Sequence, residues 1–234
     1  NPASALVPTL TAGFGSGRTA TMVETGSWHT CALLDDGSVS CWGNNAYGQL
    51  GDGSTTNRWV PTQVNGLGAE AISVALSNSA TCALLDNGTV SCWGLDVAGS
   101  SGSYSVSPSP TSSFGDNRTA VSITSLETGF CAILDDGSVS CWGSNNDGQI
   151  GDGSTTSSGA PTQTSSLGEG RTAVSISGGT GHTCAILDDG SVACWGRNDA
   201  GQIGDGSTTN RLVPTQTSSL GEGRTAVSVS TGFM

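Results

Sequence analysis

The chain has 234 residues with a formal net charge of −12 and a pI near 4.1, and all 7 of its basic residues are arginine. Because there is no basic surface to release phosphate counterions, this balance argues against a nucleic-acid or anionic-membrane partner. No apolar run is long enough to span a bilayer, so we expect no membrane insertion. No segment has the character of a signal peptide, and we expect a processed chain or an excerpt.

One pattern occurs four times along the chain: Cys-Ala-[Leu/Ile]-Leu-Asp-[Asp/Asn]-Gly-[Ser/Thr]-Val-[Ser/Ala]-Cys-Trp-Gly. Successive copies are offset by 51, 49 and 53 residues. A period near 50 residues indicates an array of small sheets, with room for about four short strands in each unit. The copies are Cys31 to Gly43, Cys82 to Gly94, Cys131 to Gly143 and Cys184 to Gly196.

Each copy of the pattern predicts a β-hairpin. In the first copy the strands are Cys31 to Leu34 and Ser38 to Gly43, and Asp35-Asp36-Gly37 forms the turn. Gly37 suits the left-handed position that closes such a turn. If Asp36 is the centre, Cys31 lies opposite Cys41, and the two side chains point to the same face of neighbouring strands.

The cysteines therefore predict four disulfides, one within each hairpin. The alternative is zinc, but the Cys-x9-Cys spacing is not that of zinc modules, and only His29 and His182 could add imidazole ligands. Eight paired cysteines imply an oxidising compartment, so we expect an extracellular protein, either secreted or at the cell surface. The predicted pairs are Cys31 with Cys41, Cys82 with Cys92, Cys131 with Cys141, and Cys184 with Cys194.

Two more strand candidates recur between the hairpins, one around Pro-Thr-Gln and one at Ala-Val-Ser-[Ile/Val]. Counted from the Pro-Thr-Gln strand, they predict a single domain over residues 1–234, with units at about 1–58, 59–106, 107–158 and 159–211 and a half unit at 212–234. The incomplete last unit suggests self-association, because an open strand is an aggregation edge.

Both faces of each hairpin are apolar, which fits a propeller blade packed between two other blades. One face carries Leu33, Val39 and the disulfide, and the other carries Ala32, Leu34 and Trp42. We therefore predict an all-β fold, a β-propeller of four-stranded antiparallel blades, with about four and a half blades present as a partial ring. We place the recurring tryptophans in the core between blades: Trp42, Trp93, Trp142 and Trp195.

Several motifs of the chain resemble the repeat of the regulator of chromosome condensation family, in the cysteine-bearing form of microbial secreted members. They are His-Thr-x-Ala-Leu, Asp-Gly-x-Val, Trp-Gly-x-Asn and Gly-Gln-Leu-Gly, at His29 to Leu33, Asp36 to Val39, Trp42 to Asn44 and Gly48 to Gly51. They recur at His182 to Ile186 and Trp195 to Gly204. The resemblance covers almost the whole chain and implies a parent ring of seven four-stranded blades.

Residues that recur at one repeat position are expected to serve the scaffold. His29 and His182 share such a position, and a structural hydrogen bond is favoured over a catalytic role. Arg18, Arg118, Arg171 and Arg224 share another, which favours a structural ion pair or backbone contact. Asp52, Asp152 and Asp205 invite a calcium interpretation, but turn capping fits their spacing better. We predict no catalytic residues, metal site or cofactor.

Residues that depart from the repeat are candidates for partner binding. Exposed aromatic side chains on the loops of a rigid ring suit contact with a protein or a glycan. We predict a non-enzymatic extracellular binding or adhesion scaffold; the alternatives are a structural subunit of a surface sheath or filament, and a secreted enzyme inhibitor. The candidate contact residues are Trp28, Tyr47, Trp59 and Tyr104.

Overall fold

The computed structural model describes residues 13–15, 17–95, 103–115 and 117–232. In this part of the chain every regular element is a strand, and the strands form four antiparallel four-stranded sheets, termed blades 1 to 4. Blade 1 contains β1 (Ala20–Thr25), β2 (His29–Leu34), β3 (Val39–Gly43) and β4 (Arg58–Gln63). Blade 2 contains β5 (Ala71–Leu76), β6 (Ala80–Leu85), β7 (Val90–Leu95) and β8 (Tyr104–Pro110). Blade 3 contains β9 (Ala120–Leu126), β10 (Gly129–Leu134), β11 (Val139–Gly143) and β12 (Ser158–Gln163). Blade 4 contains β13 (Ala173–Gly178), β14 (His182–Leu187), β15 (Val192–Gly196) and β16 (Arg211–Gln216).

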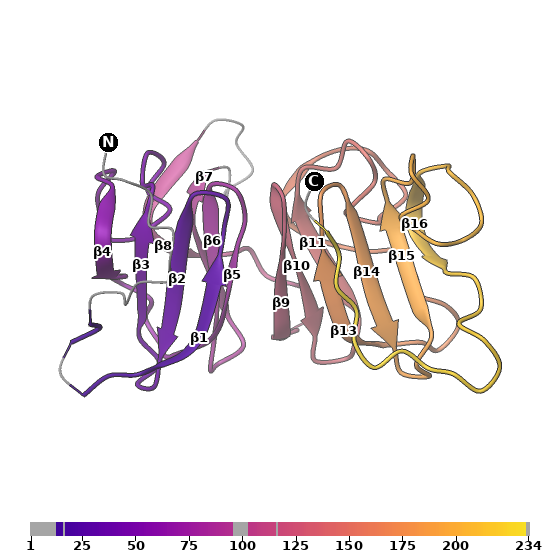
Figure 1. Cartoon of the computed structure of the whole chain (residues 1–234), viewed down its shortest axis with the longest axis horizontal. Helices are drawn as coiled ribbons and strands as arrows, with labels where there is room; N and C mark the ends of the chain where they lie inside the picture. Colours follow the sequence, from indigo (N-terminus) through magenta and orange to yellow (C-terminus); the bar gives the residue numbers. More distant parts are fainter. Residues whose placement is uncertain (1–12, 16, 96–102, 116, 233–234) are drawn as a thin grey trace, which may run out of the picture.

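The blades form an arc in chain order (Figure 1). The first strands of successive blades contact one another, β1 with β5, β5 with β9 and β9 with β13, so these strands lie on the inside of the arc. The fourth strands lie away from them, with β4 and β16 at the two ends of the view in Figure 1. The predicted fold class, an all-β propeller of four-stranded blades, is confirmed, and the described blades do not close a ring.

The hairpins have the predicted register. In blade 1, Cys31 pairs with Cys41 and Leu33 pairs with Val39. Gly37 takes a left-handed φ of 72°, and a Cβ placed on it would lie 2.6 Å from the Cβ of Glu70 in the connection to blade 2. Glycine is therefore required at this turn both for its conformation and for the close approach of the next blade.

The four-stranded sheets are offset by one strand from the predicted repeat units. The Pro-Thr-Gln strand β4 pairs with β3 of the preceding hairpin, with Cys41 opposite Thr62, and so it closes blade 1 instead of opening the next unit. The same holds for β16, which belongs to blade 4 and not to the predicted half unit at 212–234. The short connection 64–70 crosses between blades, whereas the long loop 44–57 stays within one.

The core lies between the blades. The disulfide face of each hairpin packs against the Ala, Leu and Trp face of the following one, as Cys31 and Val39 of blade 1 do against Ala83 and Trp93 of blade 2. The same packing joins blades 2 and 3 and blades 3 and 4. Trp93, Trp142 and Trp195 are buried as predicted, whereas Trp42, on the face of blade 1 that no described blade covers, is half-buried.

The disulfide face of blade 4 is covered differently. Segment 226–231 lies where the first strand of a further blade would begin, since Ala226 N donates to Gly190 O just as Ala173 N donates to Gly137 O. Val229 of this segment packs against Cys184, Cys194 and Ile203. Blade 4 therefore has a much thinner cover on this face than blades 1 to 3 have.

Candidate protein-interaction surface

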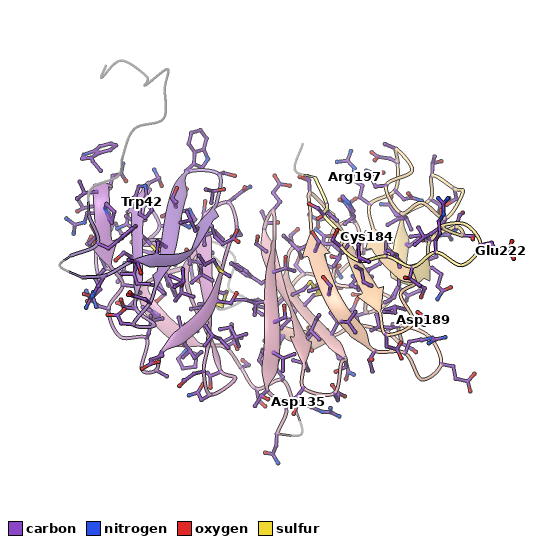
Figure 2. All side chains as sticks on the ribbon, turned by 60° about the horizontal axis from the view of Figure 1, so that its bottom comes forward. Trp42, Asp135, Cys184, Asp189, Arg197 and Glu222 are labelled. Atoms are coloured by element: carbon purple, nitrogen blue, oxygen red, sulfur yellow. A yellow bond between two sulfur atoms is a disulfide. The ribbon has the colours of Figure 1, made fainter. Side chains whose placement is uncertain are left out.

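The sheets have two different edges. The hairpin turns lie along one edge, termed the hairpin edge, and the connections between first and second and between third and fourth strands lie along the other, termed the loop rim. Figure 2 shows Asp135 and Asp189 at the hairpin edge, with Arg197 and Trp42 toward the loop rim. The candidate contact residues all belong to the loop rim, because Trp28 precedes β2, Tyr47 follows β3, and Trp59 and Tyr104 lie at the starts of β4 and β8.

The hairpin edge is lined by ion pairs. Arg18 Nε lies 3.0 Å from Asp36 Oδ2, and Arg171 Nη2 lies 2.8 Å from Asp189 Oδ2. Arg118 pairs with Asp136 in the same way. The structural ion pairs predicted for three of the four repeated arginines are therefore confirmed. Because these side chains are about one-third exposed, solvent screens each pair and its contribution to stability is small.

The loop after the third strand is organised around a buried asparagine. Asn45 Nδ2 donates to the carbonyls of Ser54 at 3.0 Å and Thr56 at 3.1 Å, and its Oδ1 accepts from Leu50 N at 2.9 Å. Blades 3 and 4 repeat this network. The sequence interpretation missed these residues, although asparagine stands two positions after Trp-Gly in three of the four copies: Asn45, Asn145 and Asn198.

Asp52 caps a turn of this loop, as predicted. Its carboxylate accepts from Ser54 N at 2.9 Å and from Arg58 Nε at 2.7 Å. Burial alone would raise the pKa of Asp52, but the hydrogen bonds from Ser54 and Arg58 lower it below its ordinary value. At the equivalent site the Ser207 hydroxyl and Arg211 lower the pKa of Asp205 to about 2. Within the described ranges, no three His, Cys, Asp or Glu side chains gather as a metal site would require.

The same loop joins each blade to the next. Gln49 O of blade 1 accepts hydrogen bonds from Trp93 Nε1 at 2.8 Å and from Thr81 Oγ1 at 2.9 Å, both in blade 2. Gly51 permits this approach, because a Cβ there would lie 2.8 Å from Trp93 Nε1. The junction between blades 3 and 4 repeats the contact, with Gln149 O accepting from Trp195 Nε1 at 2.9 Å and from Thr183 Oγ1 at 3.0 Å.

His29 extends the first of these junctions. Its Nε2 lies 2.8 Å from Thr81 Oγ1, and because that hydroxyl donates its proton to Gln49 O, His29 Nε2 must be the donor. His29 is therefore a neutral imidazole with its proton on Nε2, and burial lowers its pKa to about 4. The predicted structural hydrogen bond of His29 is confirmed, and it joins His29 to Thr81 of blade 2.

Acidification should destabilise the protein through this histidine. The unfolded imidazole binds a proton near pH 6.5 and the folded one only near pH 4, so stability present above pH 6.5 is lost as the pH falls toward 4. We expect the contribution of His29 to the free energy of unfolding to fall by about 2 kcal/mol between about pH 7.5 and pH 5. Denaturant unfolding at the two pH values measures the change, and His29→Gln should remove most of it. An equal loss in His29→Gln would contradict this assignment.

The candidate aromatic residues fall into two groups. Tyr47 of blade 1 and Tyr104 of blade 2 form an edge-on pair across the junction, with ring centroids 6.5 Å apart. At the junction between blades 3 and 4 the corresponding contact is a hydrogen bond from Asn210 Nδ2 to Asp147 Oδ1 at 3.3 Å. The first junction thus presents a half-exposed aromatic pair where the other presents polar groups.

Trp28 and Trp59 lie on the flank of blade 1. Trp59 occupies the position of Val106 and Leu212, whose carbonyls accept from Gly53 N and Gly153 N in the loop of the preceding blade. Trp28 occupies the position of Gly181, which contacts the loop of blade 3 through Asp147. The two indoles therefore take positions that, in later blades, face the loop of the blade before.

The described part of the chain contains no helix long and apolar enough to cross a membrane. All four predicted disulfides are formed. Each joins two directly opposed cysteines on neighbouring strands, with Cα atoms 4.0 to 4.1 Å apart. The fold and the loop rim together define a class, a disulfide-containing repeat β-propeller that presents loop side chains along one edge.

Within that class, the chain belongs to the family of the regulator of chromosome condensation (RCC1) repeat. The model of this repeat matches residues 36–84, 136–186 and 189–233, and a second model of the same repeat matches residues 71–100 and 173–202. The resemblance inferred from the motifs is confirmed.

Two relatives with different names match most of the chain. Human E3 ubiquitin-protein ligase HERC2 is 32% identical over 90% of this chain, which covers 4% of HERC2. The ultraviolet-B receptor UVR8 of Arabidopsis thaliana is 32% identical over 87% of this chain, which covers 47% of that protein. The chain therefore spans at most about half the length of these two relatives.

Solved structures show the same fold. Human WBSCR16 superimposes with a TM-score of 0.81 at 23% identity, over 95% of this chain and 57% of that one. Yeast RCC1 (Prp20), crystallised bound to Kap60, gives 0.77 at 20% identity, over 93% of this chain and 53% of that one. At these identities the likeness concerns the fold alone.

Proposed function

We propose that this chain is a non-enzymatic extracellular binding module that presents the loop rim of a disulfide-containing propeller to a protein or glycan partner. The observation that carries the proposal is a concentration of exposed aromatic side chains on this rim, each at a position where the repeat departs from its pattern. Their exposed fractions are 73% for Trp28, 42% for Tyr47, 85% for Trp59 and 54% for Tyr104.

The extracellular location is supported by the cysteines. Every cysteine is in a disulfide, and most of the cysteines are completely buried. Disulfides of this kind form and persist in oxidising compartments and are rare where thiols are kept reduced. The sheath subunit and the inhibitor remain alternative roles of the same binding scaffold.

A protein partner is supported by what other propellers of this fold bind. Yeast RCC1 (Prp20) was crystallised with Kap60, and Prp20p has been characterised for binding to Gsp1p and histones. Kap60, Gsp1p and histones are partners of the yeast protein. The exposed indoles of Trp28 and Trp59 are the type of side chain that dominates protein interfaces, with large apolar area and a polar edge.

A matched pair of variants tests the proposal. Partners captured on the immobilised chain from a secreted-protein extract, and glycans retained on an array, are compared for Trp28→Ala/Tyr47→Ala/Trp59→Ala and for Val121→Ala/Val174→Ala. The two valines are exposed apolar residues at the hairpin edge, at 57% and 61%. We expect the loop-rim variant to lose about tenfold or more in affinity and the hairpin-edge variant to bind as the parent does. Equal binding by both variants would remove the loop rim from the proposal, and assembly into filaments in sedimentation would favour the sheath subunit.

A further inference from the structure

The hairpin turn of blade 2 departs from the repeat at positions that the other three blades keep unchanged. Asn87-Gly88-Thr89 stands where those blades have Asp-Gly-Ser, and Ala69, two residues before β5, stands where they have arginine. The turn belongs to the hairpin edge, which Asp135 and Asp189 mark in Figure 2. The corresponding residues of the other blades are Arg18 with Asp36 to Ser38, Arg118 with Asp136 to Ser138, and Arg171 with Asp189 to Ser191.

Blade 2 lacks both partners of the ion pair that recurs at this edge. In blade 4, for comparison, Arg171 Nη2 lies 2.8 Å from Asp189 Oδ2. Blade 2 combines Ala69 with Asn87, so neither of these two charges is present. The Asn87 side chain is exposed and is not held by an arginine at this position.

Asn87 nevertheless forms the same turn as the aspartates. Its Oδ1 accepts from Thr89 N at 3.0 Å, as Asp36 Oδ1 accepts from Ser38 N at 3.1 Å. Because the oxygen of the exposed amide is bonded within the turn, the nitrogen Nδ2 is the atom that it offers to solvent. The fold therefore uses one end of this side chain and leaves the other accessible.

The three residues of the turn have the acceptor sequence for N-linked glycosylation. That sequence is Asn-x-Ser/Thr with any residue except proline in the middle, and its natural place is a surface loop of a secreted protein. Asn87-Gly88-Thr89 satisfies it at an exposed hairpin turn. The aspartates of the other three blades do not, although their turns have the same geometry.

A second match to the acceptor sequence, at residues 117–119, has a structural explanation. Asn117 has a φ of 59°, and it stands where other repeats have Gly17 and Gly170, with φ of 79° and 67°. Asparagine is one of the few residues besides glycine that adopt this left-handed conformation readily. No such backbone requirement applies to Asn87, since aspartate makes the same turn elsewhere.

We propose that Asn87 is a site of N-linked glycosylation, with the glycan on the hairpin edge. The donor is an oligosaccharide linked through pyrophosphate to a lipid. Asn87 Nδ2 forms a bond to the anomeric carbon of the sugar and loses one proton, while the bond from that carbon to the pyrophosphate oxygen breaks. The lipid pyrophosphate leaves with the electron pair. Asn87 Oδ1 takes no part, so the turn bond from Thr89 N is kept.

The inference rests on the proposed extracellular location, because the acceptor sequence has meaning for a secreted chain. It adds a polar, bulky group to the edge of the sheets that does not carry the four exposed aromatic residues. A glycan on Asn87 should therefore leave partner binding through the loop rim unaffected.

Secretion of the whole chain from yeast behind a cleavable signal peptide tests the site. Peptide N-glycosidase in H₂¹⁸O converts a glycosylated asparagine into aspartate that carries ¹⁸O, and mass analysis of peptides locates the label. We expect the label at Asn87 in most molecules, and in a larger fraction than at Asn117. A parallel sample without the enzyme should show no label. A secreted chain without label at Asn87, or with equal label in both samples, would overturn the proposal.

Two variants that restore the residues of the other blades serve as matched controls. Asn87→Asp should lose the label at this turn and melt within about 2 °C of the enzymatically deglycosylated parent, because the aspartate turn is already used three times in the chain. Asn117→Gly should keep the label at Asn87. An Asn87→Asp chain with the same glycan mass as the parent would refute the assignment.

The hydroxyl residue gives a further control. Thr89→Ser keeps an acceptor sequence and should retain label at Asn87, whereas Thr89→Ala removes that sequence and should abolish it. Label that persists in Thr89→Ala would contradict enzymatic transfer to this site.

The site and the loop-rim function can fail separately. The variant Trp28→Ala/Tyr47→Ala/Trp59→Ala should be labelled at Asn87 as the parent is, and Asn87→Asp should bind a loop-rim partner as the parent does. Unlabelled Asn87 in a secreted, oxidised chain that binds its partner would overturn the glycosylation site alone. Label at Asn87 together with unchanged binding by the triple variant would overturn the loop-rim function alone.

Discussion

Reduction of the four disulfides should unfold the protein at temperatures where the oxidised form is folded. Each bond closes a short loop, with a sequence separation of 10, and the chain-entropy treatment of such a loop gives about 2 to 3 kcal/mol. Four such contributions approach the total stability of a typical domain, about 5 to 15 kcal/mol. Thermal unfolding followed by circular dichroism, with and without a strong reductant, measures the effect.

The bonds should not be reduced together. Cys184 and Cys194 are 5% and 3% exposed and are covered mainly by segment 226–231, whereas the other six cysteines are at most 1% exposed behind a complete neighbouring blade. Thiol labelling under graded reductant should therefore detect Cys184 and Cys194 first. A protein with eight labelled thiols and an unchanged melting temperature would contradict the stabilising role, and early labelling at Cys131 would contradict the packing argument.

Replacement of Asn145 by alanine should be among the most damaging single changes in the loop rim. The side chain is completely buried, donates to the carbonyls of Ser154 and Thr156 at 3.1 Å each, and accepts from Ile150 N at 2.8 Å. Alanine leaves all three backbone groups unpaired, and each buried polar group without a partner costs about 1 to 3 kcal/mol. We expect the free energy of unfolding to fall by about 3 to 5 kcal/mol in urea titration.

Asn146 provides the control for this change. It is the next residue in the same loop, it is exposed, and its amide contacts the Ser144 hydroxyl at 3.5 Å. Asn146→Ala should stay within about 0.5 kcal/mol of the parent. Because Ile150 and Gln149 depend on the Asn145 network, Asn145→Ala should also alter the fluorescence of Trp195, and similar stability of the two alanine variants would refute this role.

Equivalent positions in the four blades show where the repeat pattern is broken. Where the loop network is present, as in blades 1 and 3, the next blade offers both a tryptophan nitrogen and a threonine hydroxyl to one carbonyl. In blade 2 the Gly-Gln-[Leu/Ile]-Gly motif is missing from the sequence, and in the following blade Phe130 stands where blades 2 and 4 have the threonine. The two departures therefore occur in neighbouring units, on the two sides of one junction.

The hairpins, their register and the four disulfides could be predicted from the amino-acid sequence alone. These features follow from local rules, since a tight turn at Gly37 sets which residues face each other and the side-chain period of two sets their face. The apolar pattern on both faces was sufficient to predict stacked blades, and repetition was sufficient to assign Arg18 and Asp52 to the scaffold.

The packing of the blades was needed to establish which blade each outer strand joins and which contacts the departures from the repeat make. Strand β4 is nearer in sequence to β5 than to β3, yet it pairs with β3, because the long loop between them is compacted by the buried Asn45. Likewise, Trp93 and Trp142 occupy the same place in the repeat, but among the described residues Trp93 finds an acceptor and Trp142 does not. Such outcomes depend on what a neighbouring blade brings to the junction, and local pattern carries no information about contacts between residues so far apart in sequence.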